Sequence, residues 1–223
     1  IQVYTGYGMS ETCPLLSTTW LPLNAAEMSV EEQVRERVRT GKPVPLVNMR
    51  IIDSKGRFLP HNGEDMGEVV VRTPWLTQGY LNEPDKSDEL WATGWMHTGD
   101  VGSIDAGYTL QIRDRIKDVI KTGGEWVSSL DIENLISQHP DIELAAVVGL
   151  PDAEWGERPH AVVTVRSGAS VSYEDLVAHM TPLVEEGHIE KWAIPDSLQV
   201  VAEIPRTSVG KIDKKLIRSQ LAD

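Results

Sequence analysis

Four short segments combine residue types that can do chemistry together. They are residues 7–11, residues 95–100, residues 115–118 together with 123–126, and residues 205–212. Their carboxylates suit hard cations, their basic side chains can neutralise an anion, and their glycines allow a ligand close to the backbone. Each segment alone is a weak signal, so their order and separation carry the argument.

Each segment also has an ordinary structural explanation. Residues 7–11 could form a turn whose Ser10 caps a helix, and residues 98–100 a solvated turn, since glycine and aspartate are common in turns. The glycine pair at 123–124 is typical of a flexible turn, and most lysines, of which Lys211 is one, lie in solvent. These explanations stay open for any segment taken singly.

The charge of the chain excludes some partners. Its 223 residues carry 21 Lys and Arg against 34 Asp and Glu, a net charge of −13. So acidic a surface repels phosphate polymers and anionic membranes, so nucleic acid is excluded as a partner. The last 18 residues, 206–223, differ, because five basic residues face two acidic ones there. This basic end can meet one small anion.

Cysteine usage and apolar runs bear on location. Cys13 is the one cysteine, which excludes an internal disulfide and suits a reducing compartment, so we expect a cytoplasmic protein. No apolar run approaches the roughly 18–20 residues of a membrane-spanning helix, and no signal peptide is visible. The sequence starts at Ile1 and runs straight into a glycine-rich motif. We therefore expect it to be part of a longer chain.

The elements that must position these segments change character along the chain. Ser29 and Glu32 form a capping box that predicts a helix, with Val30, Val34 and Val38 as its apolar face. Between residues 47 and 112, short apolar runs alternate with turn clusters. This pattern predicts strands at 49–52, 68–72 and 108–112 in a small antiparallel sheet or barrel.

Beyond residue 117 the pattern is that of a compact α+β domain of about one hundred residues. Strands are expected at 144–148, 160–165 and 198–201. Helices are expected at 129–138, after a cap at Ser172, and from about Asp213. The fold class predicted for the whole chain is α+β, with a β-rich, barrel-like part at 1–116 and a compact domain at 117–223.

In this order and at these separations, the four segments resemble the adenylate-forming (ANL) superfamily, which includes the acyl-CoA synthetases. The resemblance covers essentially the whole chain. It implies that a carboxylate and ATP form acyl-AMP and pyrophosphate, after which the acyl group passes to the thiol of coenzyme A. It also implies that residues 1–116 end the large adenylating domain and that 117–223 are the small mobile domain. The family's phosphate loop and acyl pocket lie upstream, so these 223 residues alone are expected to be inactive.

The resemblance assigns roles to the first segment. Glu11 resembles the carboxylate that helps to hold Mg²⁺, which proteins commonly bind through one or two carboxylates plus substrate phosphates. Ser10 would direct its hydroxyl at the α-phosphate, although many relatives have Thr there. Tyr7 would pack on the adenine ring, and Gly8 would permit a close approach of the backbone.

The middle segments would hold the nucleoside and the hinge. Asp100 resembles the aspartate that accepts both ribose hydroxyls, and Arg115 would reach the same ribose. Lys117 stands where the family places the hinge between its domains, a position at which relatives carry Asp or Lys. His97 is interpreted as a structural neighbour, and the scattered histidines predict no histidine metal site.

The last segments would serve both half-reactions. Lys211 resembles the catalytic lysine, whose ammonium would bridge the carboxylate oxygen and the α-phosphate in the transition state. Gly123 and Gly124 would line the pantetheine tunnel. Trp126, where many relatives have Asn, resembles the group acting on medium- or long-chain fatty acids. Arg158 could meet a phosphate of coenzyme A or form a helix-end salt bridge.

Two alternatives to the synthetase remain. One is a ligase that stops at acyl-AMP or loads a carrier protein instead of free coenzyme A. The other is a non-catalytic module that binds nucleotide or coenzyme A. A homodimer is left open, and the expected partners are a fatty acid, ATP and coenzyme A, with no transmembrane segment.

Overall fold

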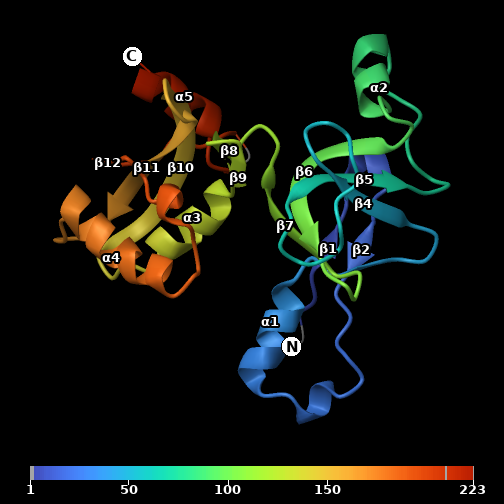
Figure 1. Cartoon of the computed structure of the whole chain (residues 1–223), viewed down its shortest axis with the longest axis horizontal. Helices are drawn as coiled ribbons and strands as arrows, with labels where there is room; N and C mark the ends of the chain where they lie inside the picture. Colours follow the sequence, from blue (N-terminus) through green and yellow to red (C-terminus); the bar gives the residue numbers. More distant parts are fainter. Residues whose placement is uncertain (1–2, 209, 223) are drawn as a thin grey trace. The chain divides into compact units, whose positions relative to one another are not determined.

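In the computed structural model the polypeptide packs into two units, Ile1–Ile116 and Lys117–Asp223 (Figure 1). The structure describes residues 3–208 and 210–222. Both units mix helices with antiparallel sheet, so the predicted α+β class is confirmed. Within the described residues, no helix is long and apolar enough to cross a membrane.

The first unit is rich in strands. In chain order its elements are β1 (Gly6–Tyr7), η1 (Ser10–Thr12), β2 (Ser17–Thr18), η2 (Ala25–Glu27), α1 (Val30–Val38), β3 (Lys42–Pro43), β4 (Asn48–Ile52), β5 (Gly67–Arg72), α2 (Pro84–Leu90), β6 (Met96–Ile104) and β7 (Leu110–Arg115). Its sheets run in the orders β1-β2-β3 and β4-β5-β6-β7, with antiparallel neighbours throughout. Among the described residues no ladder joins β7 to β4, so the larger sheet is open and is not a closed barrel.

Alternation along the strands builds the core of this unit. Successive side chains of a strand point to opposite faces, so every second residue can enter one core. Met49 and Ile51 of β4 and Val69 and Val71 of β5 do so, and Leu16 joins them from outside the strands. This core carries the strands that position the first and second sequence segments.

The apolar face predicted for α1 is present in the sequence but is not buried. The capping box between Ser29 and Glu32 is present, and the helix occupies Val30–Val38 as predicted. Val30, Val34 and Val38, however, are 77%, 49% and 64% exposed. No residue of α1 is buried, so this helix is fixed by its caps and by polar contacts near its end rather than by a valine face.

The second unit is a sheet with helices on both sides. Its elements are β8 (Ile120–Thr122), β9 (Glu125–Val127), α3 (Ser129–Ile136), β10 (Ile142–Asp152), β11 (Gly156–Val165), α4 (Tyr173–Glu185), η3 (Lys191–Ala193), β12 (Ser197–Val200) and α5 (Lys214–Ala222). The sheet order is β10-β11-β8-β9, and β12 joins β11 in parallel. The predicted cap at Ser172 forms, Ser128 caps α3 in the same way, and Pro182 lies inside α4.

The side chains on the two faces of this sheet pack in two separate cores. Ala145 and Val147 of β10 pack in one core with residues of α3 and α4. Ala146 and Val148 face the other core, which Ile217 of α5 completes. The sheet is therefore buried on both faces, which explains the continuous apolar run through the middle of β10.

Two segments differ from what their residue types suggested, one because a turn extends into a predicted strand and one because a strand includes residues typical of turns. The strand expected at 108–112 begins at Leu110, since Tyr108 has a φ of 60° and belongs to the preceding turn. Residues 98–100, which resembled a turn, lie inside β6, a strand paired with β5 on one side and β7 on the other. The alternative explanation of residues 98–100 as a solvated turn is therefore wrong, because Asp100 is only 8% exposed.

Candidate active site in two parts

Three of the predicted nucleoside-binding residues meet in the first unit. The hydroxyl of Tyr7 donates a hydrogen bond of 2.7 Å to Oδ2 of Asp100. Nε of Arg115 lies 3.4 Å from Oδ1 of the same carboxylate, and Asp100 and Arg115 are cross-strand partners in β6 and β7. Burial, together with the charge of Asp100, raises the pKa of Tyr7 well above its ordinary value of 10.0. Tyr7 therefore stays protonated and donates to Asp100 at every physiological pH.

The neighbours of Asp100 fix its backbone. Thr98 accepts from the Asp100 amide and donates to the carbonyl of Val69, which ties the segment to β5. Glu68 accepts from the Gly99 amide at 3.1 Å and lies 2.8 Å from Nδ1 of His97. His97 is thus linked to the Gly99 backbone through Glu68.

Glu11 lies on the short helix η1 that follows Tyr7. Its Oε1 accepts a 2.7 Å hydrogen bond from the hydroxyl of Tyr80, and its carbonyl accepts one from the Thr77 amide. The hydrogen bond to Glu11 also raises the pKa of Tyr80. Ser10 is exposed and opens η1, whose N-cap is Met9, so Ser10 does not act as a helix cap.

The donor set at Glu11 fits Mg²⁺ only when substrate phosphates complete it. Residues 3–208 and 210–222 hold no group of three or more His, Cys, Asp and Glu that could bind a metal by itself. One carboxylate, with the remaining ligands from phosphate and water, is nevertheless a common way to hold this cation. Glu11 would be the protein ligand in such an arrangement.

Gly8 has a requirement that the sequence did not reveal. A Cβ at Gly8 would lie 1.7 Å from the carbonyl oxygen of Pro14, so no other residue fits the present backbone. The close approach that the structure contains is therefore between two parts of the chain itself. The chain is therefore folded back on itself between Gly8 and Pro14, around the short helix η1.

The glycine pair of the second unit makes a tight hairpin turn between β8 and β9. Gly123 and Gly124 have φ values of 60° and 89°, which a two-residue turn with positive φ at both positions requires. A Cβ at Gly123 would lie 3.2 Å from the exposed ring of Trp155, whereas nothing lies within 4 Å of one at Gly124. Trp126 is half-buried, with Nζ of Lys121 6.0 Å from its ring centroid.

Lys211 stands on a structured loop. The amide of Thr207 donates to the Lys211 carbonyl at 2.7 Å, and the Lys211 amide donates back to the Thr207 hydroxyl at 3.3 Å. Arg206 donates to the carbonyl of Gly210 at 2.9 Å. Val209 lies outside the described residues. The backbone on either side of Lys211 is thus fixed while its side chain is exposed.

A buried ion pair lies at the start of α5, close in sequence to Lys211, and sequence reasoning missed it. Nζ of Lys214 lies 2.8 Å from Oε1 of Glu133 and donates to the hydroxyl of Ser129 at 2.6 Å. The same Glu133 oxygen accepts from the Val147 amide at 2.7 Å. Lys214 follows Lys211 by three residues, but nothing in that spacing identifies its partner on α3.

The backbone near Lys117 is tied separately on each side. The Ile116 amide donates to the carbonyl of Gly99 in the first unit at 2.9 Å. Arg218 of α5 donates to the Lys117 carbonyl and pairs with Asp118, both at 3.0 Å, in the second unit. The change from one unit to the other therefore occurs at the peptide bond between Ile116 and Lys117.

Arg158 already has partners. Its Nε and Nη2 donate to the two carboxylate oxygens of Asp196 at 2.9 and 2.6 Å, and its Nη1 donates to the Trp192 carbonyl. Of the two roles left open for Arg158, the salt bridge is the one present, although it joins β11 to the start of β12 rather than a helix end.

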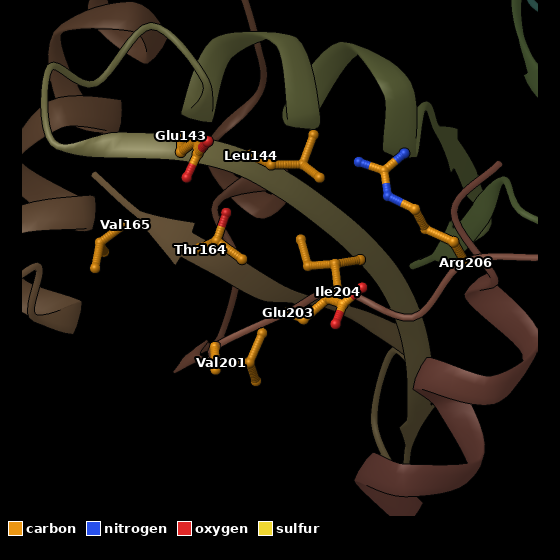
Figure 2. Close-up of a pocket in the computed structure, with 9 residues that line it drawn as sticks. Glu143, Leu144, Thr164, Val165, Val201, Glu203, Ile204 and Arg206 are labelled. Atoms are coloured by element: carbon orange, nitrogen blue, oxygen red, sulfur yellow. The ribbon is translucent and has the colours of Figure 1, made fainter. Parts of the chain in front are cut away.

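An open groove of about 520 Å³ lies where the strands β10 and β11 meet the segment that leads to Lys211 (Figure 2). Leu144, Val201 and Ile204 give it apolar walls, and the carboxylates of Glu143 and Glu203 lie at its edge. The guanidinium of Arg206 also lines the groove, so its charged groups are of both signs. The described lining residues include none of the predicted nucleotide-binding residues.

The predicted site residues thus fall into two groups. Tyr7, Asp100 and Arg115 are in direct contact, with Ser10 and Glu11 on the adjoining helix η1. Gly123, Gly124, Trp126 and Lys211 belong to the second unit.

Two protein-family models match parts of the chain. Residues 1–81 match the family described as AMP-binding enzyme. Residues 131–211 match the family described as AMP-binding enzyme C-terminal domain. The first match contains the segment from Tyr7 to Glu11, and the second contains Lys211.

Individual relatives match the chain as well. The chain is 41% identical over 221 residues to a long-chain-fatty-acid–CoA ligase of Thermus thermophilus, covering 99% of this chain and 40% of that protein. It is 38% identical over 218 residues to a 3-methylmercaptopropionyl-CoA ligase of Ruegeria lacuscaerulensis, covering 97% and 39%. ATP-bound MatB from Rhodopseudomonas palustris superposes with a TM-score of 0.78 at 29% identity, covering 98% and 40%.

The chain belongs to the adenylate-forming superfamily of AMP-binding enzymes. Both relatives above are acyl-CoA ligases by name. The chain spans about two fifths of the length of these relatives.

Proposed function

We propose that the whole protein is an AMP-forming acid–thiol ligase that makes acyl-coenzyme A. In the first step a carboxylate oxygen attacks the α-phosphorus of ATP, giving acyl-AMP and pyrophosphate. In the second step the thiol sulfur of coenzyme A attacks the acyl carbon, AMP leaves, and the thiol proton is lost. The contact of Tyr7 and Arg115 with the Asp100 carboxylate is the observation that carries this proposal, because it is a preorganised acceptor for paired hydroxyls.

The first unit would bind the nucleotide. Asp100 accepts the ribose hydroxyls while Arg115 reaches the same sugar, and the ring of Tyr7 packs on adenine. Ser10 directs its hydroxyl at the α-phosphate. Glu11 would hold Mg²⁺, which when bound neutralises phosphate charge.

The second unit would serve both steps in turn. In adenylation, the ammonium of Lys211 neutralises the charge that develops between the carboxylate and the α-phosphate. In thioester formation, Gly123, Gly124 and Trp126 line the path of the pantetheine arm. We propose Lys117 as the hinge, because the backbone on each side of it is bonded to a different unit and a hinge needs only a few residues that absorb rotation.

The substrate is proposed to be a medium- or long-chain fatty acid. Support comes from Trp126 and from the 41% identity to a protein named as a long-chain-fatty-acid ligase. The 3-methylmercaptopropionyl-CoA ligase, at 38% identity, is named for a different acid. Chain length therefore has to be measured.

Further parts of the proposal concern the chain as a whole. Adenylation is not expected from these 223 residues alone, because the resemblance puts the phosphate loop and the acyl pocket in the part of the relatives that they do not span. A cytoplasmic location is proposed from the supply of ATP and coenzyme A and from the unpaired Cys13. A homodimer is a further proposal, which sedimentation of the whole protein tests.

The test is ATP–pyrophosphate exchange by the whole protein with straight-chain acids from acetate to long chains. We expect exchange to peak in one chain-length class and to fall by about 10²–10³-fold in Lys211→Ala, since that is the usual effect of removing one charge-stabilising group. Lys215→Ala is the matched control, because Lys215 is an exposed lysine on α5. Thioester formation from supplied acyl-AMP should survive Lys211→Ala.

The product decides among the alternatives. Acyl-coenzyme A as the product supports the synthetase, whereas acyl groups found only on a carrier protein favour the carrier-loading ligase. Nucleotide binding without exchange, for any acid, favours a non-catalytic module. Equal loss of both half-reactions in Lys211→Ala would contradict the proposed alternation around Lys117.

A further inference from the structure

Tyr80 makes a specific contact with the proposed metal ligand. Its hydroxyl donates a 2.7 Å hydrogen bond to Oε1 of Glu11, a residue 69 positions away. Among the described residues, Oε2 of Glu11 has no hydrogen-bond partner. The Tyr80 contact therefore selects one carboxylate oxygen and fixes the direction of the other.

Hydrogen bonds through Ser87 fix the backbone of Tyr80. The Tyr80 amide donates to the hydroxyl of Ser87 at 2.8 Å, and this hydroxyl in turn donates to the Glu83 carbonyl at 2.7 Å. A Cβ at Gly79 would lie 2.6 Å from the Ser87 hydroxyl oxygen, so the loop packs closely against α2. Tyr80 thus reaches Glu11 from a fixed backbone although the residue is 40% exposed.

A second bond joins the same two segments. The amide of Thr77 donates to the Glu11 carbonyl at 3.0 Å, and the Trp91 indole donates to the Thr77 carbonyl at 3.3 Å. Residues 77–80 therefore hold both the backbone and the side chain of Glu11. Two bonds to one residue constrain its position and its rotamer together.

We propose that Tyr80 is a positioning residue for cation binding, orienting the Glu11 carboxylate so that Oε2 points toward the divalent cation of the nucleotide complex. The inference rests on the proposed function of Glu11. Groups that hydrogen-bond to a metal ligand fix its orientation, and their loss commonly weakens metal affinity or activity by about 10–100-fold. Removing the Tyr80 hydroxyl leaves the cation-binding carboxylate in place but free to rotate.

The experiment compares the whole wild-type protein with Tyr80→Phe, Glu11→Gln and Tyr108→Phe. Tyr108→Phe is the matched control, since Tyr108 is a tyrosine of the same unit, is 51% exposed and contacts the His61 ring edge to face. Binding of Mn²⁺ in the presence of ATP is measured by electron paramagnetic resonance, because Mn²⁺ shares the oxygen-ligand preference of Mg²⁺. The Mg²⁺ dependence of ATP–pyrophosphate exchange is measured in parallel.

We expect Tyr80→Phe to weaken Mn²⁺ binding by about tenfold or more and to raise the Mg²⁺ concentration for half-maximal exchange by the same factor. The maximal rate at saturating Mg²⁺ should fall much less, and Tyr108→Phe should match wild type. Cation binding unchanged in Tyr80→Phe would overturn the inference. A higher KM for ATP with an unchanged cation requirement would overturn it too, because the hydroxyl would then act on the nucleotide itself.

Glu11→Gln separates this inference from the function on which it depends. If Glu11→Gln weakens cation binding and Tyr80→Phe does not, the role of Tyr80 is wrong and that of Glu11 stands. If neither substitution affects cation binding, the assignment of Glu11 as the metal ligand is wrong, and the inference fails with it.

Discussion

The hydroxyl of Tyr7 donates a 2.7 Å hydrogen bond to Oδ2 of Asp100, joining residues 93 positions apart. Tyr7 lies on β1 of one sheet and Asp100 on β6 of the other, so the bond connects the two sheets of the first unit. Oδ1 of the same carboxylate faces Arg115 at 3.4 Å. Each carboxylate oxygen has a second lone pair, so the arrangement orients Asp100 and leaves it able to accept further hydroxyls.

Removing that hydroxyl should weaken nucleotide binding. In Tyr7→Phe the aromatic ring remains while the charge-assisted hydrogen bond, worth about 1.5–3 kcal/mol, is lost. We expect the KM for ATP of the whole protein to rise about tenfold, because a tenfold change corresponds to about 1.4 kcal/mol, close to the lower end of that range. Steady-state ATP–pyrophosphate exchange measures it, and Tyr108→Phe controls for the loss of a hydroxyl elsewhere. An unchanged KM would show that Asp100 needs no orientation by Tyr7.

Local signals in the sequence predicted local structure well. The capping box at Ser29 and Glu32 and the cap at Ser172 form as expected, because each involves residues within one helical turn. The helical spacing of Val30, Val34 and Val38 predicted an apolar face on α1, but these three residues are exposed. Periodicity identifies an apolar face, but only the packing partner decides whether that face is buried.

The candidate site was predictable only as a set of motifs. Asp100 sits among turn residues, and its burial comes from pairing with β5 and β7, which no local pattern reports. Tyr80 lies 69 residues from its partner Glu11. Glu133 lies 81 residues from its partner Lys214. Contacts at such separations depend on the folded chain, so sequence spacing alone could not find them.

Limited proteolysis should cut the chain close to Lys117. Residues on either side are bonded to different units, so trypsin can act on this stretch without unfolding either. We expect the first tryptic products of the chain to end at Lys117 or at the nearby exposed Arg115, as identified by mass spectrometry.

Lys117→Gln provides the control for this cut. In that variant the first cleavage should shift to a neighbouring basic residue and keep two stable products. A first cut between residues 140 and 200 would contradict the boundary, because that region forms the sheet and the helices of the second unit.

Breaking the buried ion pair should destabilise the second unit. The side chains of Lys214 and Glu133 are each 10% exposed, and removal of one partner from a buried pair leaves an uncompensated charge at a loss of about 3–5 kcal/mol. Lys214→Met should therefore reduce the hydrogen-exchange protection of the amides of β10 and β11 by a corresponding amount.

Two variants make this stability test specific. Lys215→Met, at an exposed position of α5, should change protection by less than about 0.5 kcal/mol. Adding Glu133→Gln to Lys214→Met should restore part of the loss, because the amide oxygen still accepts from Val147 and no buried charge remains. Equal effects of Lys214→Met and Lys215→Met would indicate that the ion pair contributes little.

Stability of the second unit should fall as the pH drops below 6.5 because of His160. Burial lowers the pKa of His160 below its ordinary value of 6.5, and the charge of Arg158 lowers it further while Asp196 and Asp152 oppose the shift. The unfolded chain then binds more protons than the folded chain between the lowered pKa and 6.5. The stabilising contribution is present above 6.5 and is lost as the pH falls through the lowered pKa.

Replacing His160 by an uncharged residue should remove that dependence. In His160→Gln, hydrogen-exchange protection of the β11 amides should decline less between pH 7 and pH 5 than in wild type, with intrinsic exchange rates corrected for pH. His188→Gln is the control for replacing a histidine elsewhere in the same unit, because the His188 ring is mostly exposed. Identical slopes in wild type and His160→Gln would mean that protonation of His160 is not coupled to unfolding.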